Sequence, residues 1–322
     1  MNKMMRAAVC VRAGGPEVLE IRELPVPAVR AGWSLVRVQG AGLNRSELRT
    51  RQGHSPAVRF PRVLGIECVG VVAASTDPRL AEGTTVAAVM GEMGRAFDGG
   101  YAEYALLPNP LLMPVTTTLP WTVLAALPET YLTAWGALDA LGIGPGTAGR
   151  LLIRGGTSSV GLAAASIAAG HGVEVAATTR SPAKAGLLTG HVLIDDGGPL
   201  TGLPELWPEG PDWVLDLVGA RTAVDSLRLV RRGGTVCVAG SLSGWIVPDF
   251  EPIAKIPSGT RLTAFHSDDL KGSTALLQRI IGEVEAGTHR AGVDRVFPLD
   301  DVAAAHRYLE DDRAAGKLVL VP

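Results

Sequence analysis

A glycine-rich turn between a predicted strand and a predicted helix is the stretch of this chain best suited to binding a ligand. Residues 151–153 form a short apolar run, typical of a strand buried on both faces of a parallel sheet. The sequence GGTSSVG follows at residues 155–161, and residues 162–169 have the small side chains of a closely packed helix. Glycine lets the backbone approach a phosphate, and the first turn of a helix offers unpaired N–H groups. The stretch predicts a site for the pyrophosphate of a dinucleotide. The expected contacts are Gly156, Thr157, Ser158, Ser159, Val160 and Gly161.

The turn departs from the dinucleotide motif at one position, because Ser158 replaces the middle glycine. A tight turn that binds no ligand is therefore an alternative.

The next predicted strand, residues 173–177, favours the dinucleotide. NAD-binding units place Asp or Glu about 20 residues after the glycines to bind the ribose 2′-hydroxyl. This chain has Thr179 there, followed by Arg180, Ser181 and Lys184. Cationic side chains at a position that lacks a carboxylate favour a 2′-phosphate, because they form charge-assisted hydrogen bonds with it. The sequence therefore predicts NADPH as cofactor. A solvated basic loop is the alternative.

The composition limits the classes of partner and compartment. A chain of 322 residues is expected to form about two domains. Its net charge of −2 gives no reason to expect nucleic acid or an anionic membrane as a partner. Cys10, Cys68 and Cys237 are far apart, so we expect neither a disulfide framework nor a cysteine zinc site. We expect a soluble cytoplasmic protein, because no signal-peptide pattern or membrane-spanning apolar stretch is seen.

The first part of the chain is predicted to be rich in strands, and the rest to alternate strands with helices. Residues 1–120 contain short apolar or alternating runs separated by turn residues, which suggests a small barrel. The expected strands there are 7–11, 19–24, 34–39, 69–74, 85–89 and 101–107. Residues 124–141 have helical periodicity. Six strands of a doubly wound parallel sheet are then expected, at 151–153, 173–177, 192–194, 213–218, 236–239 and 262–265.

The last part of the chain is predicted to return to the first domain. Residues 270–286 and 302–309 are expected to be helices, and residues 317–321 a closing strand. The expected fold class is α/β, with a catalytic domain over 1–120, a dinucleotide-binding domain over 121–267, and a return to the catalytic domain over 268–322.

Motifs spread along the whole chain resemble those of zinc-independent medium-chain dehydrogenases/reductases, in their quinone oxidoreductase branch. They are GGPEVLEI at 14–21, AGLNRSELRTRQG at 41–53, LGIECVGVV at 64–72, YLTAWGAL at 131–138, RGGTSSVG at 154–161, TTRSPAK at 178–184 and GKLVL at 316–320. The resemblance implies a GroES-like β-barrel catalytic domain and a Rossmann NADP-binding domain.

Zinc alcohol dehydrogenases share this fold, but this chain lacks the residues that would bind the metal. Their motif carries a cysteine near Asn44 and a Gly-His-Glu triplet, whereas this chain has Gly65-Ile66-Glu67. The four cysteines of a structural zinc lobe are missing from residues 90–105. We therefore expect no metal, and we expect Glu67 to be paired within the fold. Without a Lewis acid, simple alcohol oxidation is disfavoured.

The chemistry that remains is hydride transfer from NADPH to a quinone or to a C=C bond conjugated to a carbonyl. The resemblance places Asn44 beside the nicotinamide ribose and Thr133 at the carboxamide. It places Gly240, Ser241 and Leu242 against the nicotinamide half, with Phe265 and His266 at the end of the final strand. Each position also has a structural alternative: Asn44 as a turn residue, Thr133 as a helix N-cap, and Gly240 as a tight turn.

No proton donor stands out in the sequence. Some relatives carry a tyrosine five residues after the Asn44 position, where this chain has Arg49. Arg49 could anchor a substrate oxygen or lie on the surface, so Asn44 and Arg49 are weak candidates for the substrate pocket. We leave the catalytic residue unassigned, because water can supply the proton. The alternatives to a reductase are a non-catalytic NADPH-binding structural or regulatory protein and a zinc-free alcohol or carbonyl dehydrogenase.

The final strand of the predicted parallel sheet, residues 261–265, alternates polar and apolar residues as an edge strand does. No proline or central lysine protects it, and an unprotected edge invites pairing with another chain. We expect a homodimer in which this strand pairs with its antiparallel copy, as is common among proteins of the resembled family. A monomer in which residues 266–271 cover the edge is the alternative.

Overall fold

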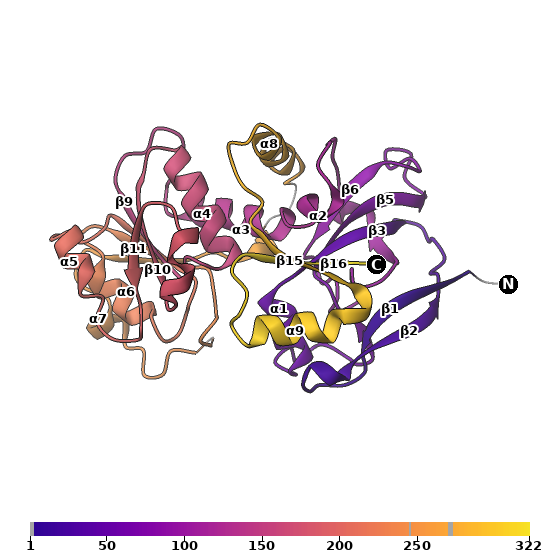
Figure 1. Ribbon diagram of the computed structural model, residues 1–322, viewed down its shortest axis with the longest axis horizontal. Coiled ribbons are helices and arrows are strands. Elements are labelled where there is room, and N and C mark those ends of the chain that lie inside the picture. The colour runs from indigo at the N-terminus through magenta and orange to yellow at the C-terminus, as the bar shows by residue number, and fades with distance from the viewer. Residues whose placement is uncertain (1–2, 245, 270–272) are drawn as a thin grey trace. The chain divides into compact units, whose positions relative to one another are not determined.

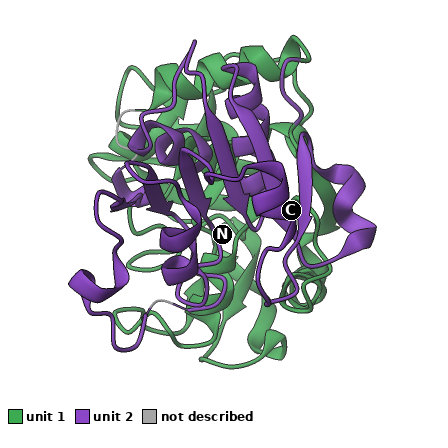
Figure 2. Ribbon diagram, turned by 90° about the vertical axis from the view of Figure 1, so that its left-hand side faces the viewer, with its two compact units in different colours: residues 1–132, 271–287, 291–322 green, residues 133–270, 288–290 purple. Residues whose placement is uncertain are grey.

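The computed structural model describes residues 3–244, 246–269 and 273–322, and the chain divides into two compact units (Figures 1 and 2). Unit 1 consists of residues 1–132, 271–287 and 291–322, and unit 2 of residues 133–270 and 288–290. The division falls inside helix α3 (Pro128–Ala140), which lies within the helix predicted for residues 124–141. The three domain segments expected from the sequence stay a prediction.

Unit 2 contains the predicted doubly wound sheet, and all its neighbouring strands are parallel. The strand order is β11-β10-β9-β12-β13-β14. The bounds are β9 (Arg150–Arg154), β10 (Glu174–Thr179), β11 (His191–Ile194), β12 (Trp213–Asp216), β13 (Thr235–Val238) and β14 (Arg261–Ala264). Each lies within two residues of its predicted position. The strand that leads into the glycine turn is central, and its residues Leu151, Leu152 and Ile153 are fully buried, as their apolar run predicts.

Helices cover the sheet of unit 2. Their bounds are α4 (Ser159–Gly170), α5 (Gly202–Leu206), α6 (Ala223–Leu229) and α7 (Pro252–Lys255). The buried alanines of α4 allow its backbone to pack close to β9 and β10. A hydrophobic cluster in this unit joins Leu152 of β9 to Trp207 and to Leu227 of α6. The apolar side chains of the central strands are therefore buried against these helices.

Unit 1 is built from two antiparallel-rich sheets around one core, as expected for a GroES-like barrel domain. The larger sheet has the order β15-β16-β3-β5-β6-β8, with β7 also paired to β3, and the smaller has the order β2-β1-β4. The bounds are β1 (Met4–Cys10), β2 (Leu19–Pro25), β3 (Trp33–Leu43), β4 (Arg62–Val63), β5 (Glu67–Ser75), β6 (Thr85–Val89), β7 (Tyr104–Pro108), β8 (Leu112–Pro114), β15 (Val293–Pro298) and β16 (Lys317–Val321). The predicted return of the C-terminal strand is confirmed, because β16 pairs with β3 through Val319 and Gly42.

The helices of unit 1 are mostly short. They are α1 (Arg45–Arg51), α2 (Trp121–Leu124), α8 (Thr274–Glu285) and α9 (Val302–Glu310). Helix α9 was predicted and packs Val302, Ala305 and Leu309 into the core. The predicted helix over 270–286 is confirmed from Thr274 onward, whereas residues 270–272 lie outside the described residues. Within the described ranges, no helix combines the length and the hydropathy needed to cross a bilayer.

Candidate functional site

The glycine turn of unit 2 runs from β9 into α4, and its residue types follow from its geometry. Gly155 has a φ of +79°, which a side chain would strain. A Cβ on Gly161 would lie 2.6 Å from the carbonyl oxygen of Gly155, so only glycine fits there. The Ser158 hydroxyl donates to Gly155 O at 2.7 Å and accepts from Gly161 N at 3.1 Å. Ser158 therefore caps α4, and its replacement of the motif's middle glycine is compatible with the turn.

The end of β10 is bound directly to this turn. The Gly155 N–H donates to Thr178 Oγ1 at 3.1 Å, and the Gly156 N–H donates to the Thr178 carbonyl at 2.9 Å. The hydroxyl oxygens of Thr157 and Thr179 lie 3.5 Å apart. The structure thus brings together the residues predicted to bind the pyrophosphate and those predicted to bind the ribose.

Thr179 also fixes the segment that follows it. Its buried hydroxyl accepts a hydrogen bond from the Ser181 N–H at 3.2 Å. Arg180 is exposed, and Lys184 lies partly exposed in the short 3-10 helix Pro182–Leu187. Two cations therefore follow the end of β10 where an NAD-binding unit would have a carboxylate.

The loop after β12 is held by a buried carboxylate that sequence reasoning missed. Asp216 Oδ1 accepts hydrogen bonds from the N–H groups of Val218 and Gly219, both at 2.9 Å, and from Thr222 Oγ1 at 2.8 Å. Its Oδ2 accepts from Ser226 Oγ at 2.6 Å. These bonds fix the start of the loop. The available signal was a single acidic residue inside the apolar strand predicted for residues 213–218.

The predicted residues after β13 lie against that loop. A Cβ on Gly240 would come within 2.1 Å of the Leu217 carbonyl oxygen, so the close approach of the two loops requires glycine. Leu242 Cδ1 lies 3.7 Å from the position a Cβ on Gly155 would take. Gly240 and Leu242 are thus placed beside the glycine turn, with Ser241 between them in the chain.

Thr133, Phe265 and His266 have different surroundings within unit 2. Thr133 is buried inside α3, so the alternative that it caps the start of a helix is wrong. The ring of Phe265 packs against α3 one turn after Thr133, since a Cβ on Gly136 of that helix would lie 2.1 Å from the ring. His266 is exposed, and its Nδ1 lies 3.9 Å from Asp268 Oδ2. The structure therefore brings Phe265 next to α3 and directs the His266 side chain to solvent.

In unit 1, Asn44 belongs to a buried charged network. Lys317 Nζ donates to Glu67 Oε1 and to Asn44 Oδ1, both at 2.5 Å, and Asn44 Nδ2 donates to Glu67 Oε1 at 2.8 Å. Lysine can only donate and a carboxylate can only accept, so the orientation of the Asn44 amide is fixed. The expectation that Glu67 is paired within the fold is confirmed. Sequence reasoning missed Lys317, whose signal was a single charge in the apolar strand KLVLV.

Gly42 makes room for this network. A Cβ there would lie 2.1 Å from Glu67 Oε1 and 2.5 Å from Lys317 Cε. The other Glu67 oxygen accepts from the Glu129 N–H at 2.9 Å. Both charged side chains are almost fully buried, so the pair and its hydrogen bonds must compensate for lost hydration.

Helix α1 begins directly after Asn44, whose N–H donates to Glu47 Oε2 at 3.2 Å. Glu47 Oε1 accepts from the Ile66 N–H at 3.1 Å. Burial, together with the negative charge of Glu67, raises the pKa of Glu47 to about 7, although the hydrogen bond from the Ile66 N–H and the charge of Lys317 oppose the shift. Arg49 lies partly exposed in the same helix. Asn44 is therefore the residue that starts α1 and links it to the ion pair.

The part of the chain that the structure describes contains no group of three or more His, Cys, Asp or Glu side chains that could hold a metal ion. Cys10, Cys68 and Cys237 are buried free cysteines. Burial raises the pKa of the Cys68 thiol to about 12, which disfavours the thiolate that a metal would need. The metal-free character of the protein stays a prediction.

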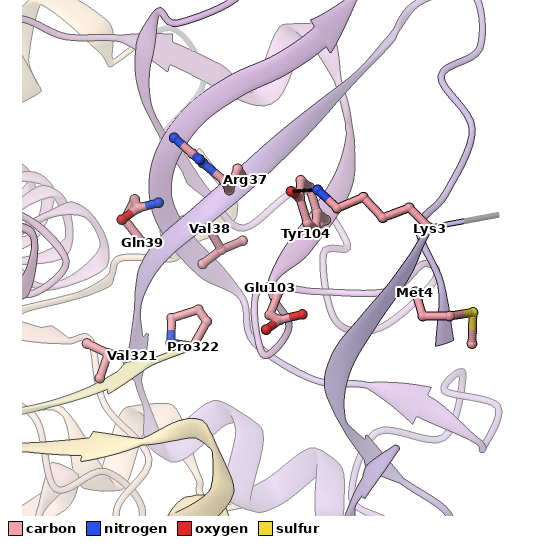
Figure 3. A pocket seen from close by; sticks show the side chains of 9 residues that line it. All are labelled: Lys3, Met4, Arg37, Val38, Gln39, Glu103, Tyr104, Val321 and Pro322. Carbon is pink, nitrogen blue, oxygen red and sulfur yellow. Dashed lines mark hydrogen bonds between the residues drawn. The ribbon is translucent and has the colours of Figure 1, made fainter. Parts of the chain in front are cut away.

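Unit 1 also has a surface pocket of about 510 Å³ that is separate from these residues (Figure 3). Lys3 Nζ donates to the Tyr104 hydroxyl at 2.5 Å on one side of it. It is lined by Lys3, Met4, Arg37, Val38, Gln39, Glu103, Tyr104, Val321 and Pro322. None of the residues predicted to bind cofactor or substrate lines this pocket.

Comparisons with known proteins agree with this architecture. Residues 30–117 match the alcohol dehydrogenase GroES-like domain, and residues 191–320 match a domain described as zinc-binding dehydrogenase. Human quinone oxidoreductase is 28% identical over 99% of this chain and 98% of its own length. A solved NAD-dependent alcohol dehydrogenase is 30% identical, with a TM-score of 0.87 over 99% of this chain and 100% of its own. The mycobacterial protein Rv1454c, solved in complex with NADPH, is 27% identical, with a TM-score of 0.87 over the same shares.

Both domain types are present in the order that the sequence motifs predict, and the relatives cover nearly the whole chain. The described structure has the GroES-like barrel and the six-stranded parallel sheet of these enzymes. The chain therefore belongs to the medium-chain dehydrogenase/reductase family, in its quinone oxidoreductase branch, and is an oxidoreductase of a pyridine-nucleotide-binding family.

Proposed function

We propose that this protein is an NADPH-dependent reductase that transfers hydride to quinones or to α,β-unsaturated carbonyl compounds without zinc. The observation that carries the cofactor assignment is the end of β10. Thr179 is buried there and bonded to the Ser181 N–H, and Arg180 and Lys184 follow it. Two cations and no carboxylate at this position suit a 2′-phosphate. A relative of similar fold is known in complex with NADPH.

The residues of unit 2 have the chemistry that a dinucleotide requires. The N–H groups in the first turn of α4, at Ser159 and Val160, have no acceptor within the helix and suit the pyrophosphate oxygens. Arg180 and Lys184 would hold the 2′-phosphate. Residues 240–242, with Thr133, Phe265 and His266, would hold the nicotinamide half. The bound cofactor supplies a hydride, and the chain positions it and limits access of water.

Asn44 is also proposed to contact the nicotinamide ribose. Its amide is fixed by Lys317 and Glu67, so it would present a preorganised hydrogen-bonding edge. Arg49 is the weaker candidate for a contact with a substrate oxygen. No proton donor is assigned. A quinone or enone that accepts a hydride forms an oxyanion or enolate, which can take its proton from water.

The absence of zinc is part of the proposal. Ile66 has no nitrogen to offer a metal, and Glu67 is engaged by Lys317 and by the Glu129 N–H. Substrates are therefore expected to be electrophiles that need no Lewis acid. Elemental analysis of the purified protein should find no stoichiometric zinc, and one zinc per chain would reopen alcohol oxidation.

A homodimer through β14 is also proposed. In the described sheet β14 is the last strand and pairs with β13 on one side. Leu262 of β14 is 39% exposed, and Ile253 of the preceding helix α7 is 94% exposed. Apolar side chains beside an exposed strand edge are suited to pairing with a second copy. The alternative is a monomer in which residues 266–271 cover this edge. Residues 270 and 271 of that segment lie outside the described residues.

A panel of anaerobic assays separates the reductase from its two alternatives. NADPH is mixed with quinones and enones, and NADP⁺ is mixed with alcohols, while the absorbance of reduced nicotinamide is followed. Loss of NADPH with a quinone or enone is the expected result. Nucleotide binding without any turnover would favour a structural or regulatory protein, and formation of NADPH from alcohols would favour a zinc-free dehydrogenase.

A further inference from the structure

Arg154, the last residue of β9, has a buried guanidinium held by two carboxylates. Its Nε and Nη2 donate to Asp195 Oδ2 at 3.2 and 2.8 Å, and its Nη1 donates to Asp225 Oδ2 at 2.5 Å. The Arg154 side chain is 3% exposed. Asp195 follows β11, and Asp225 lies in α6. Burying an arginine and its acidic partners costs free energy, because the charged groups lose hydration. A function for this group would explain why the chain retains it.

Asp195 lies beside the position that distinguishes the two dinucleotides. Its N–H donates to the Thr179 carbonyl at 3.0 Å. Ile194, the residue before it, is directly opposite Thr179 in the pairing of β11 with β10. Thr179 replaces the carboxylate of NAD-binding units, but Asp195, directly after the adjacent strand β11, supplies another carboxylate.

The charge of that carboxylate would oppose a phosphate. A carboxylate near the ribose favours a 2′-hydroxyl, which can donate to it, and repels a 2′-phosphate. Arg154 counters this effect by donating twice to Oδ2, while the Gly197 N–H donates to Oδ1 at 3.3 Å. Both oxygens of Asp195 thus accept hydrogen bonds from the protein. The next residue, Asp196, is exposed, so water screens its charge.

We propose that Arg154 is a specificity-determining positioning residue for the cofactor. It neutralises Asp195 and holds it within the protein, which keeps the end of β11 compatible with a 2′-phosphate. Arg154 acts through Asp195 and not by touching the nucleotide. The inference rests on the proposed dinucleotide site in unit 2, and it concerns how strongly that site prefers NADPH to NADH.

The test measures the ratio of the Kd for NADH to the Kd for NADPH, by fluorescence titration of each nucleotide. Arg154→Met removes the charge at similar length and should lower this ratio about tenfold or more, because Asp195 is left uncompensated. The double variant Arg154→Met, Asp195→Asn should return the ratio to within about threefold of the parent value, since the repelling charge is gone.

Two further variants separate charge from structural support. Asp225→Asn removes the other acceptor of the guanidinium but leaves the pair with Asp195, so the ratio should stay within about twofold of the parent. Arg154→Lys keeps the positive charge and should keep most of the preference, even where both Kd values rise. Thermal unfolding without nucleotide reports any loss of stability separately.

A merely structural role for Arg154 predicts a different pattern. Arg154→Met would then weaken both nucleotides equally and leave the ratio unchanged, which would overturn the inference, as would a double variant that fails to regain the ratio. Should Arg154→Met not fold, Asp195→Asn decides, because it should leave the ratio equal or higher, and a lower ratio contradicts the inference. Parent protein that binds neither nucleotide contradicts the proposed function instead.

Discussion

Lys317 Nζ lies 2.5 Å from Glu67 Oε1, and the two side chains are 1% and 0% exposed. The pair joins the first residue of β16 to the first residue of β5, and it fixes the Asn44 amide at the start of α1. In a zinc enzyme of the same fold, the Gly-His-Glu triplet would carry a metal-binding histidine before this glutamate. Here an internal cation, Lys317, compensates the charge of the glutamate.

Removing Lys317 is expected to be strongly destabilising. Lys317→Met leaves the Glu67 carboxylate buried without its cation and should lower the free energy of unfolding by roughly 3–5 kcal/mol. Lys317→Met with Glu67→Gln removes both charges and should be more stable than the single variant. Urea denaturation measures both. A loss below about 1 kcal/mol in Lys317→Met would contradict a compensating role for the ion pair.

His306 of α9 is expected to make unit 1 sensitive to acid. The residue is fully buried, and burial, together with the charge of Arg51, lowers its pKa from 6.5 to about 3. The unfolded chain takes up a proton below about pH 6.5, whereas the folded chain does not, so stability falls as the pH drops from 6.5 towards 3. Between pH 6.5 and 4.5 the loss through this residue should be roughly 2–3 kcal/mol.

His306→Phe keeps an aromatic ring against Tyr101 and removes the titrating group. Its unfolding free energy, measured in urea at several pH values, should depend less on pH than that of the parent between pH 6.5 and 4.5. Identical slopes for the two proteins would show that His306 is not buried in its neutral form.

The cofactor preference should depend on the two cations after β10. Arg180→Ala with Lys184→Ala should erase most of the preference for NADPH, since each charge-assisted contact contributes roughly 1.5–3 kcal/mol. Arg232→Ala removes an exposed arginine of the same unit outside the proposed site and is the matched control. Fluorescence titration of both nucleotides provides the measurement. Equal affinity of the parent protein for NADPH and NADH would falsify the assignment.

The proposed dimer should depend on β14. Light scattering at micromolar concentration should give twice the mass of one chain for the parent protein. The N–H groups of Arg261 and Phe265 bond to the side of β13, so by alternation along the strand the N–H of Ala264 lies on the free edge, and Ala264→Pro, which removes it, should yield single chains. A parent protein with the mass of one chain would end the proposal.

Much of the fold could be predicted from local sequence patterns. The apolar runs of β9, β10, β12 and β13 and the glycine turn before α4 each carry their own signal, because strand burial and tight turns restrict residue types locally. Helix α1 was not predicted, since its sequence RSELRTR shows no apolar stripe. Strand β15 was also missed, because its mixed sequence VDRVFP gains its structure from pairing with β16.

The contacts that organise the candidate site could not be predicted in the same way. Lys317 and Glu67 are 250 positions apart, and Arg154 and Asp195 are 41 positions apart. No local period encodes such pairs, because they arise only when strands from different parts of the chain become neighbours. Sequence reasoning identified Glu67 as a residue that must be paired, and only the fold supplies its partner.

The central claim is that this protein passes hydride from NADPH to an activated acceptor, and anaerobic mixing tests it most directly. Purified protein with a known amount of NADPH and an excess of quinone or enone should consume the NADPH at a rate proportional to protein concentration. One molecule of reduced acceptor should form for each NADP⁺. Bound NADPH that stays reduced with every acceptor in the panel would contradict the account.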